Sequence, residues 1–202
     1  MTVVRIREKV RERKKRATRQ RLYEVAVELF RVRGFDQTPV EAITEMAGTS
    51  KGTFFNYFPT KEHVLVAYHD HMTARILDRL AGIGEGSVED AIQGMMAVCA
   101  EWVDQDRVMG RAVVTKIFGT PVLLSADLEN TQRFMTWMMG RLRQGIRSGE
   151  LRSDLDLGLM ASMLAGVLSS TLNQWVLDPD VFDVHRELRR RTAFLFEGAR
   201  AR

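Results

Sequence analysis

Residues 34–62 read GFDQTPVEAITEMAGTSKGTFFNYFPTKE, and this stretch decides the fold of the N-terminal part of the chain. Gly34 tolerates the left-handed conformation in which helices often end, so a helix is predicted to stop there. Thr38 and Pro39 form a helix start signal, with Thr38 as the cap and Pro39 at the first helical position. After a turn at Gly48, Ser50 can cap a third, short helix over residues 51–56. Two helices joined by a tight turn that contains glycine indicate a helix-turn-helix.

Apolar residues around this turn recur with the period of a helix. Upstream they follow the i, i+3, i+4, i+7 spacing of one buried stripe, on a helix predicted to run to about Arg33. The stripe consists of Leu22, Val25, Ala26, Leu29 and Phe30. The second helix is predicted to turn Val40, Ile43, Met46 and Ala47 toward it. Phe54 and Phe58 complete this small core, so the third helix is held rigidly with its other face outward.

Positive charge is concentrated before Leu22. Residues 1–21 contain ten Lys or Arg side chains but only Glu8 and Glu12, a balance of +8, whereas the whole chain carries +4. The rest of the chain therefore sums to −4. Such asymmetry attracts a polyanion by releasing its counterions, which makes nucleic acid the leading partner. A solvated basic tail or a segment bound to a membrane surface remains the alternative, although the tail has few bulky apolar residues.

The 34–62 stretch closely resembles the DNA-binding domain of the TetR family of bacterial transcriptional regulators. Its glycine, cap, turn, aromatic and lysine positions match together, whereas the rest of the chain is similar only in helix number and length. The resemblance implies that double-stranded DNA is a partner. It places Ser50, Lys51, Gly52 and Thr53 near base edges in the major groove, and Phe55, Asn56, Tyr57 and Lys61 along the phosphate backbone, with Thr38 as a further DNA contact.

Two positions depart from the family pattern. Phe55 stands where the family usually has Tyr, so a phosphate hydrogen bond is replaced by apolar contact with a sugar or a thymine methyl. Thr49 stands where Val is usual. The basic extension is expected to add phosphate contacts, as an arm along or into the minor groove, through Arg11, Lys14, Lys15, Arg16, Thr18 and Arg19. The alternative is a tail that only raises nonspecific affinity.

The remainder of the chain is predicted to be helical, and no alternating strand pattern occurs. A helix after Thr60 carries a stripe at Val64, Tyr68, Met72, Ile76 and Leu80. Glycines at 82–86 mark a break, and further helices are expected near 87–104, 106–118, 122–147, 155–177 and 181–199. The chain is thus predicted to be all-α with about nine helices. The resemblance to the TetR family implies that residues 1–60 form the DNA-binding domain and that residues 61–202 form a bundle for effector binding and dimerisation.

Small residues recur every four positions in 155–177. Gly158, Ser162, Gly166 and Ser170 would let another helix approach closely, which makes this face the first candidate for a homodimer surface. The 181–199 helix would complete a four-helix interface with Val181, Val184, Leu188, Phe194 and Leu195. Packing within one subunit is the alternative.

A ligand pocket is expected among the helices at 87–104, 106–118 and 122–147, because Met and aromatic side chains make adaptable apolar cavities. The candidates are Met95, Met96, Cys99, Trp102, Val103, Phe118, Phe134, Trp137, Met138 and Trp175. They indicate a small hydrophobic or aromatic effector, although any one of them can be ordinary core. The resemblance implies a repressor dimer that binds a palindromic operator and is released when the effector binds.

Other functional classes find little support in the sequence. The four histidines form no recognisable metal set, and no nucleophile–base pair, phosphate loop or cofactor motif indicates an enzyme. A lone cysteine, Cys99, cannot form an internal disulfide, which predicts a cytoplasmic protein. Oxidant sensing by Cys99 is the less favoured alternative to a buried, inert thiol. Polar residues interrupt 157–177, so a buried helix is favoured there and no membrane partner is expected.

Overall fold

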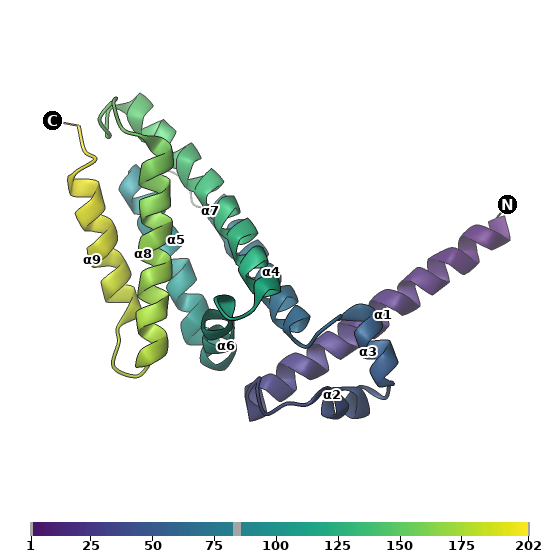
Figure 1. Cartoon of the computed structure of the whole chain (residues 1–202). Helices are drawn as coiled ribbons and strands as arrows, with labels where there is room; N and C mark the ends of the chain where they lie inside the picture. Colours follow the sequence, from purple (N-terminus) through teal and green to yellow (C-terminus); the bar gives the residue numbers. More distant parts are fainter. Residues whose placement is uncertain (1, 83–85, 202) are drawn as a thin grey trace. The chain divides into compact units, whose positions relative to one another are not determined.

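The computed structural model describes residues 2–82 and 86–201, with side chains from residue 9 onward. Helices account for every regular element of this part, apart from an isolated bridge between Leu151 and Arg200. Their bounds are α1 Thr2–Arg33, α2 Val40–Ala47, α3 Lys51–Tyr57, α4 Glu62–Ala81, α5 Val88–Gln105, α6 Arg107–Ile117, α7 Pro121–Ser148, α8 Leu157–Leu177 and α9 Val184–Glu197 (Figure 1). For the described residues, the all-α prediction and the predicted number of about nine helices are confirmed.

The chain divides into two compact units, Met1–Tyr68 and His69–Arg202. The division falls inside α4, eight residues after the boundary that the sequence suggested, because the start of α4 is held in the head. Val64 and Leu65 of this part of α4 are fully buried. The N-terminal unit is called the head below, and the C-terminal unit is called the bundle.

The head is built around the C-terminal half of α1. Its fully or almost fully buried side chains include Leu22, Ala26, Leu29, Phe30, Ile43, Ala47, Phe54 and Phe58. Gly34 and Gly48 have φ values of 82° and 64°, and they end α1 and α2 in the left-handed region that favours glycine. Met46 was predicted to face this core, but it is half exposed, because α2 has only eight residues and turns one side inward.

The predicted start of α2 is wrong in detail. Pro39 occupies the N-cap position, with extended backbone angles, and no side chain caps this helix. Thr38 is fully buried instead, and its single hydroxyl hydrogen points back toward the carbonyl oxygens of Gly34 (2.8 Å) and Leu29 (3.3 Å). Thr38 therefore satisfies carbonyls at the C-terminal end of α1, where a helix leaves acceptors without partners.

In the bundle, α5 packs against α9 and α7, while α8 lies between α7 and α9 (Figure 1). The apolar stripes of these helices meet in one core that includes Ile92, Met95, Met96, Met138, Leu142, Leu164 and Trp175. Ser87 caps α5 by accepting from the Asp90 amide (3.1 Å), as its spacing predicts. Within the described residues, no single helix is long and apolar enough to cross a membrane; α6 and α7, bent by 105°, meet those criteria only as a pair.

Candidate functional site

The third helix of the head is fixed at both ends. At its start, Ser50 Oγ accepts from the Thr53 amide (3.2 Å) and shares a hydrogen bond with the Thr53 hydroxyl (3.0 Å). At its end, Phe54 and Phe58 are buried with their ring centroids 5.6 Å apart. A short helix has little stability of its own, so these tertiary contacts hold it in place.

The outer face of α3 carries the residues that were predicted to meet DNA. Lys51, Gly52, Phe55 and Asn56 are exposed, Ser50 is exposed beside them, and Thr53 and Tyr57 are half buried. Phe54 and Phe55 are adjacent in the sequence but differ in exposure: Phe54 is fully buried, whereas 47% of Phe55 is exposed. This arrangement exposes one face of a seven-residue helix, about two turns long, and the DNA major groove is wide enough to admit an α-helix.

An ion pair that the sequence analysis missed engages Lys51. Its ammonium contacts the carboxylate of Glu41, which lies in the first turn of α2. The hydrogen bond from Lys51 lowers the pKa of the Glu41 carboxyl below its ordinary value. Both side chains are more than half exposed, so Lys51 can exchange this partner for a phosphate at little energetic cost.

Lys61 occupies a position different from the one expected of a phosphate ligand. Its ammonium donates to the carbonyl oxygens of Phe35 (2.7 Å) and Thr38 (3.0 Å) and lies 4.3 Å from the centroid of the Phe35 ring. These contacts fasten the beginning of α4 to the loop between α1 and α2. Together with the buried Thr38, Lys61 is thus placed as a residue that positions the helix-turn-helix.

Replacing Lys61 with Ala is expected to destabilise the head by about 2 kcal/mol, because two carbonyl oxygens lose a charged donor. The free energy of unfolding of the head, followed by circular dichroism in denaturant, measures this loss. Lys51→Ala is the matched control, since it removes an exposed lysine whose ion pair contributes about 1 kcal/mol or less. Unchanged stability of Lys61→Ala, together with a weaker salt dependence of DNA binding, would instead show that Lys61 is a phosphate ligand.

Basic side chains of α1 flank α3. The Arg19 guanidinium lies 5.0 Å from the centroid of the Phe58 ring, and the Arg21 guanidinium lies beside Gly48 in the turn. Arg11, Lys14, Lys15 and Arg16 are exposed further along the same helix, and the Thr18 hydroxyl donates to the Lys14 carbonyl (3.0 Å). The Thr18 hydroxyl thus already has a partner within α1.

The bundle contains a small cavity of about 60 Å³. Among the residues predicted to form a pocket, Cys99, Trp102 and Phe134 line it. The others do not: Met95, Met96, Val103, Met138 and Trp175 are buried in the core, Trp137 is half buried, and 71% of Phe118 is exposed. The cavity also takes Met72, Thr73 and Ile76 from α4 and Leu168, Ser169 and Leu172 from α8.

Polar residues that the sequence analysis did not single out form one side of this cavity. His69 Nε2 lies 3.2 Å from Asp127 Oδ1, and the buried Asn130 amide donates to Asp70 Oδ1 (3.0 Å). The other ring nitrogen of His69, Nδ1, is buried and has no hydrogen-bond partner among the described residues. Since an ionised carboxylate only accepts, Nε2 donates to Asp127 and Nδ1 of a neutral ring is left as an acceptor.

Cys99 lies on the wall of the cavity with almost no exposure. Burial raises the pKa of its thiol to about 12, so the reactive thiolate is scarce at neutral pH. Cys99 is expected to resist alkylation by iodoacetamide in the native protein and to react once the protein is unfolded. Mass spectrometry reads this directly, because the chain has one cysteine. Rapid alkylation of the native protein would favour the oxidant-sensor alternative.

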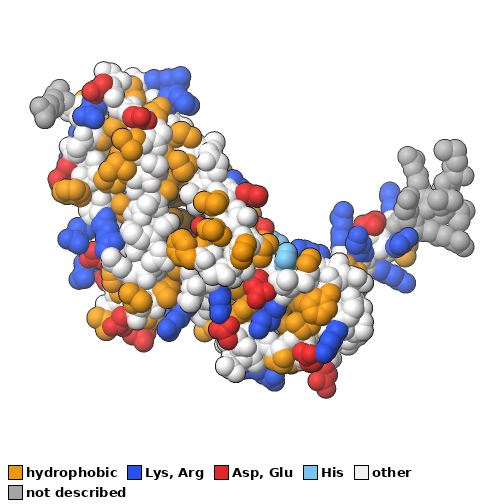
Figure 2. Space-filling model, viewed as in Figure 1, with side chains coloured by type: hydrophobic (Ala, Val, Ile, Leu, Met, Phe, Trp, Pro, Cys, Tyr) orange, Lys and Arg blue, Asp and Glu red, His pale blue; other side chains and the backbone are white. Residues whose placement is uncertain are grey.

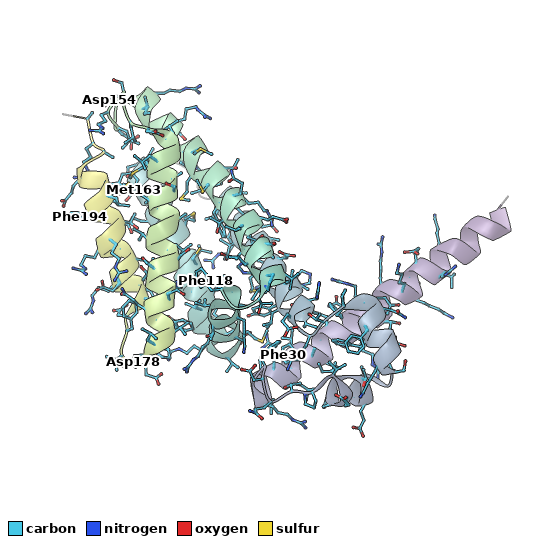
Figure 3. All side chains as sticks on the ribbon, viewed as in Figure 1. Phe30, Phe118, Asp154, Met163, Asp178 and Phe194 are labelled. Atoms are coloured by element: carbon cyan, nitrogen blue, oxygen red, sulfur yellow. The ribbon has the colours of Figure 1, made fainter. Side chains whose placement is uncertain are left out.

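The candidate dimer surface is exposed in the single chain. Gly158, Ser162, Gly166 and Ser170 all lie on the outer side of α8. Leu159 and Met163 of α8 and Phe194 of α9 are also exposed, and they line a groove of about 590 Å³. Figure 3 labels Met163 on α8 and Phe194 on α9. Leu188 is different: it is buried within its own subunit, as is Val184, because this side of α9 packs on α5. Leu195 is half buried at the edge of the groove.

Residues 22–68 match the family described as bacterial regulatory proteins, tetR family. The chain is 25% identical over 181 residues to the fatty acid metabolism regulator protein of Bacillus subtilis (strain 168), covering 85% of this chain and 90% of that protein. It is 23% identical over 171 residues to the transcriptional repressor AcnR of Corynebacterium diphtheriae, covering 84% and 87%. Among solved structures, the chain is similar to FadR of Thermus thermophilus, a TetR family transcriptional repressor solved in complex with lauroyl-CoA. The TM-score is 0.73 and the sequence identity is 28%, and the match covers 91% of this chain and 96% of that chain.

The matched segment contains all of α2 and α3, so the similarity falls on the residues that the head presents outward. The full-length relatives extend the likeness through the bundle. Residues 22–68 therefore carry a DNA-binding domain of the TetR type, and the chain is a DNA-binding transcriptional regulator.

Proposed function

We propose that this protein is a dimeric repressor that binds a palindromic operator and leaves it when a hydrophobic molecule enters the bundle. The observation that carries the proposal is the outer face of α3, where Lys51, Gly52, Phe55 and Asn56 are exposed on a helix held by Phe54 and Phe58. A rigid helix with exposed polar and apolar groups is what reads base edges in the major groove.

The outer faces of α8 and α9 support the dimer. Their exposed Leu159, Met163 and Phe194 lie next to the small residues of α8, so a second copy can approach closely and bury apolar area. A two-fold axis there repeats the head on the other subunit. Two recognition helices about 34 Å apart would then fit successive major grooves and require inverted half-sites.

The cavity supports an effector with an apolar body and a polar group. Its walls are mainly apolar, while His69 Nδ1 and the side chains of Asp127 and Asn130 form a polar side. A volume of about 60 Å³ is far below the roughly 300–1,000 Å³ of sites for drug-sized ligands, so an effector must enlarge the cavity. The lauroyl-CoA bound by the Thermus thermophilus relative makes a fatty acyl chain the first ligand to test.

Helix α4 provides the route from effector to operator. The cavity takes Met72, Thr73 and Ile76 from α4, and the same helix begins at Glu62 in the head. An effector that enlarges the cavity displaces α4 and with it the head, which changes the spacing of the two recognition helices. A coupling of about 1–3 kcal/mol is typical of such linkage and lowers operator affinity about 5- to 150-fold.

Selection of duplexes from a randomised DNA library by the full-length protein tests the operator. The expected result is an inverted repeat with half-site centres about 10 base pairs apart. Thr53→Ala is expected to change the preference at particular positions by about 1–3 kcal/mol per base pair, because Thr53 lies in the first turn of the proposed recognition helix, α3. Failure to enrich any sequence, or enrichment of single half-sites only, contradicts the proposal.

Fluorescence anisotropy on the selected duplex tests the effector. Lauroyl-CoA is expected to raise the dissociation constant for DNA, while coenzyme A without the acyl chain leaves it unchanged. Phe134→Trp, which fills the cavity, is expected to reduce the response to lauroyl-CoA and to leave DNA affinity intact. Equal effects of lauroyl-CoA and coenzyme A would show that the bundle does not respond to the apolar chain.

A further inference from the structure

Helix α1 extends toward the N-terminus well beyond the part that is buried in the head. It runs unbroken from Thr2 to Arg33, but from residue 9 onward, where side chains are described, the first fully buried residue is Leu22, and the family match also begins at residue 22. The segment 9–21, called the N-terminal rod below, is helical and exposed almost throughout. Figure 1 shows the N-terminal half of α1 running on past α3 with no other helix of the head beside it.

The rod carries a high density of exposed positive charge. Glu12 is its single carboxylate, whereas eight of its side chains are basic and exposed. These eight are Lys9, Arg11, Arg13, Lys14, Lys15, Arg16, Arg19 and Arg21. Within residues 9–82 and 86–201, none of the eight forms an ion pair with a carboxylate, in contrast to Lys51 with Glu41. Figure 2 shows blue side chains projecting on both sides of this segment. These charges are available to an external polyanion.

The charges surround the helix. Consecutive residues of an α-helix are rotated by about 100°, so Lys14, Lys15 and Arg16 point in three different directions. Val10 is the one bulky apolar side chain of the rod, and it is half exposed. The rod therefore lacks an apolar stripe with which it could pack on a protein helix or insert into a bilayer. A partner with phosphates on several sides of the helix suits this distribution best.

The rod leaves the head beside the recognition helix. Arg19 lies over the ring of Phe58, which follows the last residue of α3, and Arg21 lies beside the turn that precedes α3. Because α1 is continuous between Arg16 and Leu22, the direction of the rod is set by the buried half of the same helix. A duplex bound by α3 thus has the rod as a rigid neighbour.

We propose that the N-terminal rod is a second DNA-binding element, which remains helical and holds the duplex that flanks each half-site. This inference rests on the proposed operator binding. A helix about 10–12 Å wide does not fit a minor groove about 6 Å wide, so the rod contacts phosphates or lies in a major groove. Since α3 fills the groove of the half-site, the rod meets DNA outside it. Residues 9–19 span about 16 Å, which adds about five base pairs on each side.

The test compares two variants of the full chain on two duplexes. The rod variant replaces Arg11, Lys14, Lys15 and Arg16 with Gln, which removes four charges and keeps the helix propensity. The control variant makes the same change at Arg111, Arg143, Arg147 and Arg189, four exposed arginines of the bundle. One duplex contains only the selected operator core, and the other carries about ten extra base pairs of arbitrary sequence on each side.

On the flanked duplex, the rod variant is expected to bind at least about tenfold more weakly than the unchanged protein and to show a salt slope smaller by about three or more. On the core duplex, the two proteins are expected to differ by less than about threefold, because few flanking phosphates are present. The control variant is expected to match the unchanged protein on both duplexes. Circular dichroism of the rod variant is expected to retain its helical content.

Three results would overturn the inference. Equal losses on both duplexes would place the rod on the operator core, and unchanged affinity on both would remove it from DNA binding. The third result is that the unchanged protein cosediments with vesicles of anionic lipid, that the rod variant does not, and that the two proteins bind DNA equally well. This result would assign the rod to a membrane surface. Failure of the proposed function looks different, because the unchanged protein would then select no operator at all.

Discussion

Phe54→Ala is expected to unfold the head and to abolish specific DNA binding. The ring is completely buried in the head, and its centroid lies 5.6 Å from that of the buried Phe58 ring. Removing a buried Phe side chain costs about 3–5 kcal/mol, because apolar contacts are lost and a cavity remains. A domain the size of the head has little more stability than this, so α3 is no longer held in place.

Phe55→Ala is the matched control, since it removes the same atoms one position further along the chain. Nearly half of Phe55 is exposed, so its loss is expected to change stability by about 0.5 kcal/mol or less. Its effect on DNA is expected to be a moderate loss of affinity without loss of fold. Denaturant unfolding and fluorescence anisotropy on the selected duplex separate the two effects. Similar stabilities of the two variants would show that α3 is not oriented as described.

Trp175→Ala is expected to destabilise the bundle by about 3–5 kcal/mol. Trp175 was predicted to line the ligand pocket, but its side chain is fully buried in the core and does not border the cavity. Because the head and the bundle are separate compact units, the bundle should unfold at lower denaturant concentration while the head transition stays in place. Tryptophan fluorescence and size-exclusion chromatography measure the unfolding and any loss of the dimer.

Leu177→Ala provides the comparison for Trp175, because it lies two residues along the same helix and 83% of it is exposed. Its effect is expected to be within about 0.5 kcal/mol. Trp175→Phe is expected to be much milder than Trp175→Ala, since the indole Nε1 has no hydrogen-bond partner among the described residues and no such bond is lost. If Trp175→Phe keeps its stability but responds much more weakly to the effector, Trp175 would be a residue of the ligand site.

Several local features could be predicted from the sequence because their signals are local. Gly34 and Gly48 end helices in the left-handed conformation, and Ser50 and Ser87 cap helices with their own side chains. The outward face of α3 follows from the burial of Phe54 and Phe58, which the spacing of apolar residues indicates. Each of these features depends on residues no more than about four positions apart.

The roles of Thr38 and Lys61 could not be predicted in the same way. Both were expected at the DNA, and both serve the packing of the head: Thr38 bonds to the end of α1, and Lys61 bonds to the loop after it. Lys61 and Phe35 are 26 positions apart. A polar side chain near a predicted binding helix can serve either the ligand or the scaffold, and only the direction of its hydrogen bonds decides between them.

In the bundle, too, the sequence could not separate the two possible roles of a residue, here core packing and cavity lining. Met95, Cys99, Phe134 and Trp175 all lie on apolar helix faces, and periodicity places them equally well in a core or around a cavity. The packing of the helices decides the matter, because side chains of α4 and α8 line a cavity beside Cys99 and Phe134, whereas Met95 and Trp175 are completely buried in the core. Leu188 was likewise predicted for the dimer surface, but it faces its own subunit.

The sequence by itself determined the helices, the glycine ends of α1 and α2, the outward face of α3 and the cluster of positive charge before Leu22. These properties follow from backbone preferences and side-chain spacing within a few turns. Only the tertiary structure decided that Lys61 and Thr38 hold the head together, that Lys51 pairs with Glu41, and that His69 with Asp127 borders the cavity. Each of these depends on which distant residues meet when the helices pack, and the packing of a core is a property of the whole chain.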